Sequence, residues 1–133
     1  RHGINGEGHQ VKIVPYNSNR EAALKEIEQV LAGAGSSVDA VFFLTNYLGV
    51  LGIEAIKKLQ IRVPEQLAVL CFDDNDIFRL YTPTISVIRQ PIESIGQRAM
   101  LSLIERLRHS GEEAAPENTP VRLMADLVAR ESI

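Results

Sequence analysis

Residues 63–90 read VPEQLAVLCFDDNDIFRLYTPTISVIRQ, and this stretch decides the fold. Its apolar run, residues 67–72, is followed at once by the polar run 73–76, DDND. A short apolar run that ends in carboxylates is typical of a parallel strand that is buried on both faces and whose carboxyl end meets water. Ligands of open α/β sheets bind at that edge. Asp73 is therefore the first candidate for function, as an acceptor for hydroxyl or amino donors. The alternative is that Asp73 and Asp74 only cap the next turn.

Two strand-helix units precede this stretch. Residues 11–14 predict a short strand, and Ser18 with Glu21 form a capping box that begins a helix. Residues 39–44, DAVFFL, predict a second buried strand, which is followed by an amphipathic helix over residues 47–60. Three alternations of strand and helix with short links indicate right-handed βαβ units and a parallel sheet.

The helix over residues 47–60 contains two glycines, Gly49 and Gly52. Each weakens a helix by up to about 1 kcal/mol relative to alanine. Two of them in the first turns indicate that a strand or a neighbouring subunit packs closely there.

The chain after residue 76 predicts smaller elements. Residues 77–83 are typical of a loop whose aromatic residues cover a pocket or contact another chain, and both alternatives stay open. Residues 84–88 predict a short strand, and Pro91 begins a helix that ends near Gly111. Residues 110–120 are an acidic loop, and residues 121–130 predict one or two closing strands.

Composition limits the class of protein. The chain has 133 residues and 45% hydrophobic content, which predicts one domain or a large piece of one. It shows neither an apolar run of about 18 residues, as a membrane span needs, nor a secretory signal in its polar first ten residues. The net charge of −3 argues against a nucleic-acid-binding surface on this chain. The lone Cys71, in an apolar run, favours a packing role and a reducing compartment.

The sequence predicts no catalytic, metal-binding or cofactor-binding residue. The serines beside glycines lie in bare loops, and the three histidines lie at terminal or helix-end positions. Asp73, Asp74 and Asp76 are suited to a hard cation, but the glycine and the distal glutamate of an EF-hand loop are missing. A phosphate-binding loop is missing too.

Polar side chains stand at the carboxyl ends of the predicted strands: Asn17, Thr45 with Asn46, Asp73 and Gln90. Because such ends line up along one edge of a parallel sheet, these residues can converge on one crevice. A carboxylate with amides suits a polyhydroxylated or heterocyclic ligand. From the residues alone, two classes stay open: a small-molecule sensor or binder, and an enzyme domain whose catalytic residues lie elsewhere.

The sequence LQIRVPEQLAVLCFDD, followed by YTPTISVIRQP and the closing LVARES, resembles the lactose-repressor/galactose-repressor family of bacterial transcription regulators. The order of these motifs is specific, although each motif alone is loose. The resemblance implies a partial periplasmic-binding-protein type I fold, an α/β lobe with a parallel sheet between two helical layers. Residues 1–89 and 120–133 would form the C-terminal lobe, and residues 90–119 a crossover helix and loop of the N-terminal lobe.

The resemblance also implies roles for single residues. Asp73, Asn46 and Gln90 match the family's effector-binding positions, and Asn17, Tyr47 and Phe78 are further effector or lid candidates. The helix from Tyr47 and the segment 75–81 resemble the family's dimer contact, which would use Leu48, Leu51, Phe78 and Tyr81. The expected protein is a cytoplasmic homodimer, not an enzyme, that binds a small effector without a cofactor and grips operator DNA through a headpiece outside this chain. The alternative is a periplasmic solute-binding protein of a sugar transporter.

Overall fold

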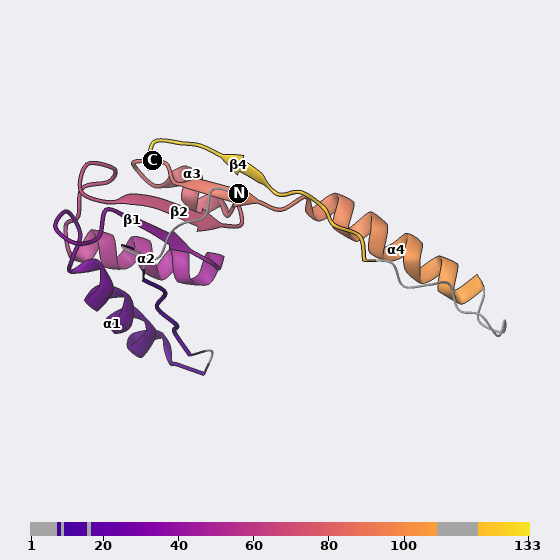
Figure 1. Cartoon of the computed structure of the whole chain (residues 1–133), viewed down its shortest axis with the longest axis horizontal. Coiled ribbons are helices and arrows are strands. Elements are labelled where there is room, and N and C mark those ends of the chain that lie inside the picture. Colours follow the sequence, from indigo (N-terminus) through magenta and orange to yellow (C-terminus); the bar gives the residue numbers. More distant parts are fainter. Residues whose placement is uncertain (1–7, 9, 16, 109–119) are drawn as a thin grey trace.

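The computed structural model describes residues 8, 10–15, 17–108 and 120–133. A small α/β body is followed by a long helix that projects away from it (Figure 1). The elements in chain order are α1 (Arg20–Leu31), β1 (Ala40–Phe43), α2 (Asn46–Lys58), β2 (Ala68–Phe72), α3 (Asp76–Leu80), β3 (Ser86–Arg89), α4 (Ile92–Arg108) and β4 (Asp126–Val128).

The strands form one sheet in the order β1-β2-β3-β4. β1 pairs with β2 in parallel, with Phe43 opposite Cys71, and β2 pairs with β3 in parallel, with Leu70 opposite Ser86. β4 returns antiparallel beside β3. The parallel arrangement expected of the strands predicted at 39–44, 67–72 and 84–88 is confirmed, so the carboxyl ends of β1, β2 and β3 share one edge.

One face of this sheet carries the core. α2 packs on the sheet and α1 packs beside α2 (Figure 1). Val69 and Cys71 of β2 are fully buried, whereas their neighbours Leu70 and Phe72 are only half-buried and Phe42 of β1 is exposed. Burial on both faces is therefore a wrong prediction for the described chain. The second face is apolar as expected, but the described residues supply no helical layer to cover it.

The first predicted strand is also wrong. The described residues of 11–14 have no strand assignment, and Val11 and Ile13 are exposed. Their alternating pattern fits a strand, but an isolated strand is not stable without a neighbour to pair with. The cap of α1 differs as well, because the side chain of Asn19, not Ser18, accepts the hydrogen bond from the backbone N–H of Ala22 at 2.8 Å.

Residues 76–80 form the short helix α3 and not a loop. Asn75 caps it, since its side-chain oxygen accepts a hydrogen bond from the backbone N–H of Ile77 at 3.1 Å. Phe78 is fully buried and lies against α2 at Gly49, which Cys71 of β2 also approaches. The lid and dimer roles expected of Phe78 are therefore wrong, because its ring is part of the core.

Close packing at Gly49 and Gly52 is confirmed. A Cβ atom on Gly49 would lie 2.8 Å from Cζ of Phe78 and 2.9 Å from Sγ of Cys71, and one on Gly52 would overlap the ring of Phe43. The thiol at this contact is inert, because burial raises the pKa of Cys71 to about 12. Gly49 and Gly52 therefore make room for core side chains of the same chain and not for a neighbouring subunit.

We expect Gly49→Ala to lower the free energy of unfolding by about 1–2 kcal/mol in total, because overpacking a filled core usually costs about 1–3 kcal/mol. The gain in helix propensity of about 1 kcal/mol does not offset it, since both neighbours are fully buried and cannot move aside. Urea titration of this chain measures the change, with the exposed Lys57→Ala on the same helix as control. Unchanged stability in Gly49→Ala would mean that the Phe78 ring is not packed as described.

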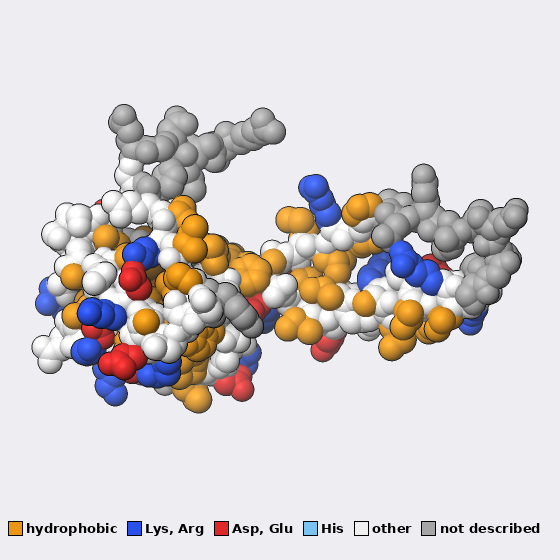
Figure 2. Space-filling model, turned by 90° about the horizontal axis from the view of Figure 1, so that it is seen from below, with side chains coloured by type: hydrophobic (Ala, Val, Ile, Leu, Met, Phe, Trp, Pro, Cys, Tyr) orange, Lys and Arg blue, Asp and Glu red, His pale blue; other side chains and the backbone are white. Residues whose placement is uncertain are grey.

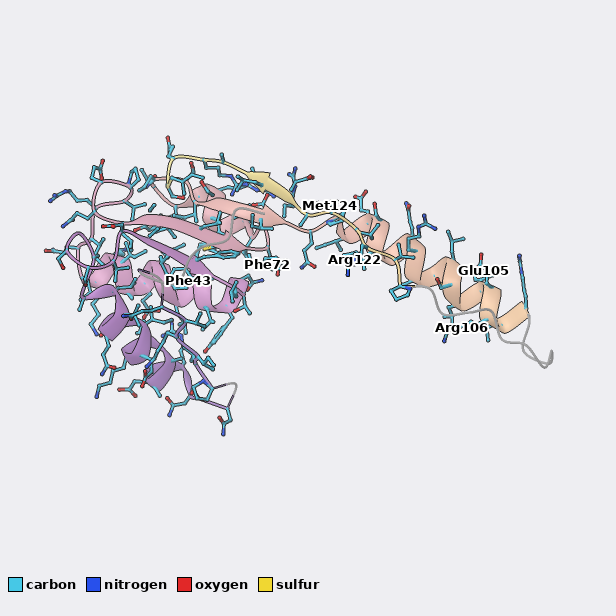
Figure 3. The ribbon with its side chains drawn as sticks, viewed as in Figure 1. Phe43, Phe72, Glu105, Arg106, Arg122 and Met124 are labelled. Atoms are coloured by element: carbon cyan, nitrogen blue, oxygen red, sulfur yellow. The ribbon has the colours of Figure 1, made fainter. Side chains whose placement is uncertain are left out.

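α4 differs from the other long helices in having no buried residue. Hydrophobic side chains gather along it (Figure 2). Met124 and Arg122 lie beside its first half, and Glu105 and Arg106 lie on its far half (Figure 3). Among the described residues, no helix combines the length and the apolar character that crossing a membrane requires. The predicted end of this helix near Gly111 and the acidic loop that follows lie outside the described residues, apart from Pro120.

Candidate functional site

The carboxyl edge of the sheet brings Asp73 and Gln90 together. Nε2 of Gln90, directly after β3, donates a hydrogen bond to Oδ1 of Asp73 at 2.6 Å. Asp73 follows β2 with a φ of +70°, and its backbone N–H donates to the carbonyl of Ile88 at 2.9 Å. Aspartate is one of the few residues that adopt this left-handed conformation with any frequency. The turn therefore places the Asp73 carboxylate and the Gln90 amide side by side at the carboxyl edge of the parallel sheet.

The other predicted site residues lie at or near this edge without the same support. Asn46 is the first residue of α2, three residues beyond the end of β1, and it is exposed, as is Tyr47. Thr45 acts as the cap of α2, because its hydroxyl oxygen accepts a hydrogen bond from the N–H of Leu48 at 3.2 Å. Asn17 is exposed in a turn before α1, and no strand of the described chain carries it to the edge.

Asp74 has a different environment from its neighbour Asp73. Its side chain is only 5% exposed and accepts hydrogen bonds from Nη2 of Arg130 at 2.7 Å and Nη2 of Arg79 at 3.2 Å. Arg89 lies at 4.0 Å. Burial raises the pKa of Asp74, but hydrogen bonds and charge from Arg130 and Arg79 outweigh it and hold the pKa below its ordinary value. Asp74 is therefore an ionised anchor.

Arg130 belongs to a closing segment that connects two strands. Its Nη1 donates to the carbonyl of Ile85 at 2.7 Å, and its backbone N–H donates to Oγ of Ser86 at 2.8 Å. Two residues later, the buried hydroxyl of Ser132 accepts from the N–H of Ser86 at 2.8 Å and donates to the carbonyl of Val69 at 2.6 Å. The motif Arg-x-Ser thus fastens the C-terminal segment to β2 and β3.

Several readings of the sequence are corrected here. Asp73 and Asp74 do not cap α3, because Asn75 does. Leu51, expected at a dimer surface, is buried in the core. The Asp74–Arg130 contact was missed, and the only signal for it was the closing LVARES motif.

Asp73 and Gln90 are half-buried at this edge of the sheet. Two shallow hollows of about 440 and 560 Å³ lie elsewhere, one between α4 and residues 120–123 and one where residues 10–12 meet the end of α1. We assign the site to the sheet edge, because a carboxylate, an amide and a strained turn converge there and the hollows have no such group of side chains.

The model of the family "periplasmic binding protein-like domain" matches residues 1–133. The chain belongs to this family. Within it, the chain resembles HTH-type transcriptional repressor PurR of Pasteurella multocida, with 31% identity over 71% of this chain and 27% of the relative. It also resembles the ribose operon repressor of Haemophilus influenzae, with 30% identity over 75% of this chain and 30% of the relative.

Solved structures of transcriptional regulators resemble this chain as well. A LacI-family protein of Sanguibacter keddieii aligns with a TM-score of 0.72 and 27% identity over 90% of this chain and 45% of that chain. The complex of the transcriptional regulator CelR with cellobiose aligns with a TM-score of 0.66 and 28% identity over 86% of this chain and 33% of that chain. The resemblance to the lactose-repressor/galactose-repressor family is confirmed, and so is the α/β fold class.

The chain is part of an effector-binding domain of this family. Its matches span less than a third of the length of the two repressors named above. Both of these relatives are repressors by name.

Proposed function

We propose that this chain is the effector-sensing and dimerisation part of a bacterial, cytoplasmic transcription regulator that is not an enzyme. The observation that carries the proposal is the contact between Asp73 and Gln90 at the carboxyl edge of the parallel sheet. The repressor relatives favour this function over the alternative of a periplasmic solute-binding protein. Operator DNA would be bound by a headpiece outside this chain, since the chain carries a net charge of −3.

The chemistry of this pair favours a ligand with hydroxyl or N–H donors. The side-chain amide of Gln90 donates one N–H to Asp73. The side-chain carbonyl oxygen of Gln90 and the second carboxylate oxygen of Asp73 remain as acceptors for a ligand. Asn46 adds an amide at the same edge, and Tyr47 adds an exposed ring on which an apolar ligand face can stack. The CelR complex contains cellobiose, a ligand rich in hydroxyl groups. We infer a sugar-like or nucleobase-like effector.

We infer further that residues 90–119 belong to a second lobe. α4 has no buried residue, although it carries exposed apolar side chains along its length that are costly to leave in water. Its exposed apolar residues are Ile92, Ile95, Met100, Leu101, Leu103, Ile104 and Leu107. An N-terminal lobe packed on them would face the edge that carries Asp73, and an effector between the lobes would favour their closed arrangement.

A homodimer is part of the proposal. Leu48 and Tyr81 are the remaining candidates for the interface, because both are half-buried at the border of the core, whereas Leu51 and Phe78 are inside it. Exposed Leu80 of α3 lies next to Tyr81 and extends this apolar surface. We expect this surface, and not the core of α2, to meet the partner.

The proposal predicts that Asp73→Ala weakens effector binding in the full-length protein by about 1.5–3 kcal/mol, the usual worth of a hydrogen bond to a charged group. This corresponds to a loss of affinity of about 10- to 150-fold. A thermal-shift screen of sugars, sugar phosphates and nucleobases supplies the effector, and calorimetry measures the dissociation constant.

Asp76→Ala is the matched control for this measurement. Asp76 is a carboxylate three residues away whose side chain is 87% exposed, and its contact is with Arg79 at 3.8 Å. Its removal should leave the affinity unchanged. Equal affinities of Asp73→Ala and the wild type would remove the sheet edge as the effector site.

A further inference from the structure

We propose that Arg130 is a positioning residue for the proposed effector site: by holding Asp74 it keeps the neighbouring Asp73 carboxylate against Gln90. The inference rests on the proposed function, because Asp73 and Gln90 are its proposed effector-binding pair. Arg130 lies 57 positions after Asp73 in sequence and is not one of the proposed effector-binding residues.

The turn at Asp73 needs external support. A non-glycine residue at φ +70° is strained by about 1–3 kcal/mol and keeps that conformation only where its surroundings impose it. On one side, the N–H of Asp73 is bound by the carbonyl of Ile88 at 2.9 Å. On the other side, the next residue along the chain, Asp74, is held by its carboxylate.

Arg130 is the best-placed group to hold Asp74. Its side chain is 14% exposed, whereas that of Arg79, the other close donor, is 54% exposed. Arg130 uses its guanidinium fork to join Asp74, after β2, to the carbonyl of Ile85, before β3. A planar fork with two fixed donors fits two acceptors at once, which a lysine ammonium on a flexible stem does not.

Loss of the Arg130 guanidinium would affect Asp73 through the peptide bond that joins Asp73 to Asp74. A carboxylate that has lost its buried cation turns toward water. The turn can then relax from the left-handed conformation, and Asp73 moves away from the amide of Gln90. The guanidinium of Arg130 thereby couples the C-terminal segment after β4 to the geometry of the effector site.

Ser132 provides a matched control. It lies on the same segment, is fully buried, and also joins β2 to β3, but through Val69 and Ser86 and not through Asp74. Ser132→Ala therefore loosens the same segment without releasing the turn at Asp73. A role of Arg130 in stability alone would be shared by both substitutions, whereas a positioning role would not.

The test uses the intact protein that carries this chain, labelled with ¹⁵N-glutamine, without effector. Arg130→Met should move the side-chain amide resonances of Gln90 toward the values of an exposed glutamine and speed their hydrogen exchange at least tenfold. Ser132→Ala should leave them in place, and Arg130→Lys should give an intermediate change. The variant Gln90→Asn assigns the signals.

Unchanged Gln90 resonances in both Arg130→Met and Arg130→Lys would overturn the inference, and so would an equal change in Ser132→Ala. If Arg130→Met does not fold, the comparison of Arg130→Lys with Ser132→Ala decides. Because the readout needs no ligand, its failure would leave the effector assignment of Asp73 to be judged by the calorimetry of Asp73→Ala.

Discussion

Phe78→Ala is expected to lower the free energy of unfolding by about 3–5 kcal/mol, the usual cost of deleting a buried aromatic ring. The ring is fully buried, it lies against Gly49 of α2, and the Cys71 thiol of β2 borders the same glycine. A cavity of that size cannot close easily, because the glycine has no side chain to fill it and β2 is held by strands on both sides. Urea or thermal unfolding of the chain measures the loss.

Leu80→Ala is the matched control, since Leu80 lies in the same short helix and is 82% exposed. We expect it to change the stability of this chain by no more than about 0.5 kcal/mol. The opposite pattern would contradict the core assignment. Wild-type stability in Phe78→Ala, together with a loss of dimer or of effector affinity, would return Phe78 to the surface role that its sequence context suggested.

Phe78 shows where sequence patterns reach their limit. The parallel strands β1, β2 and β3 were predictable, because each is a short apolar run that ends in polar residues and is separated from the next by a helix or turn. Helix α3 has only five residues, too few for the 3.6-residue period to show which side faces inward. The Phe78 ring packs into the space left by Gly49, which lies 29 positions earlier in the chain. The packing of Phe78 against Gly49 is therefore visible only in the folded structure.

The candidate site was predictable to a similar degree. Asp73 and Gln90 follow neighbouring parallel strands, so the strand order alone brings them to one edge. Asp74 looked equivalent to Asp73 in sequence, yet the two carboxylates have different partners. The partner of Asp74 is 56 residues away on an antiparallel return, and local spacing carries no signal for such a contact.

The second large effect is expected at Asp74. Asp74→Ala should lower the free energy of unfolding by about 3–5 kcal/mol, because removing one partner of a buried ion pair leaves the other charge uncompensated. The stranded charge is Arg130, whose side chain is 14% exposed, whereas Arg79 can return to water. Replacing exposed Asp76 by alanine should change stability by no more than about 0.5 kcal/mol.

The same residue should make stability depend on acid. The pKa of folded Asp74 lies below its ordinary value, since the hydrogen bonds from Arg130 and Arg79 outweigh the effect of burial. The ion pair therefore contributes fully above the unfolded pKa of about 3.9 and is lost as the pH falls through the lower folded value. Asp74→Asn has no carboxylate to titrate, so the stability gap between it and the wild type should be constant near neutral pH and shrink below about pH 4. Urea titrations across that range measure the gap, and a gap that stays constant or widens in acid would show that Asp74 is not the ionised anchor of this edge.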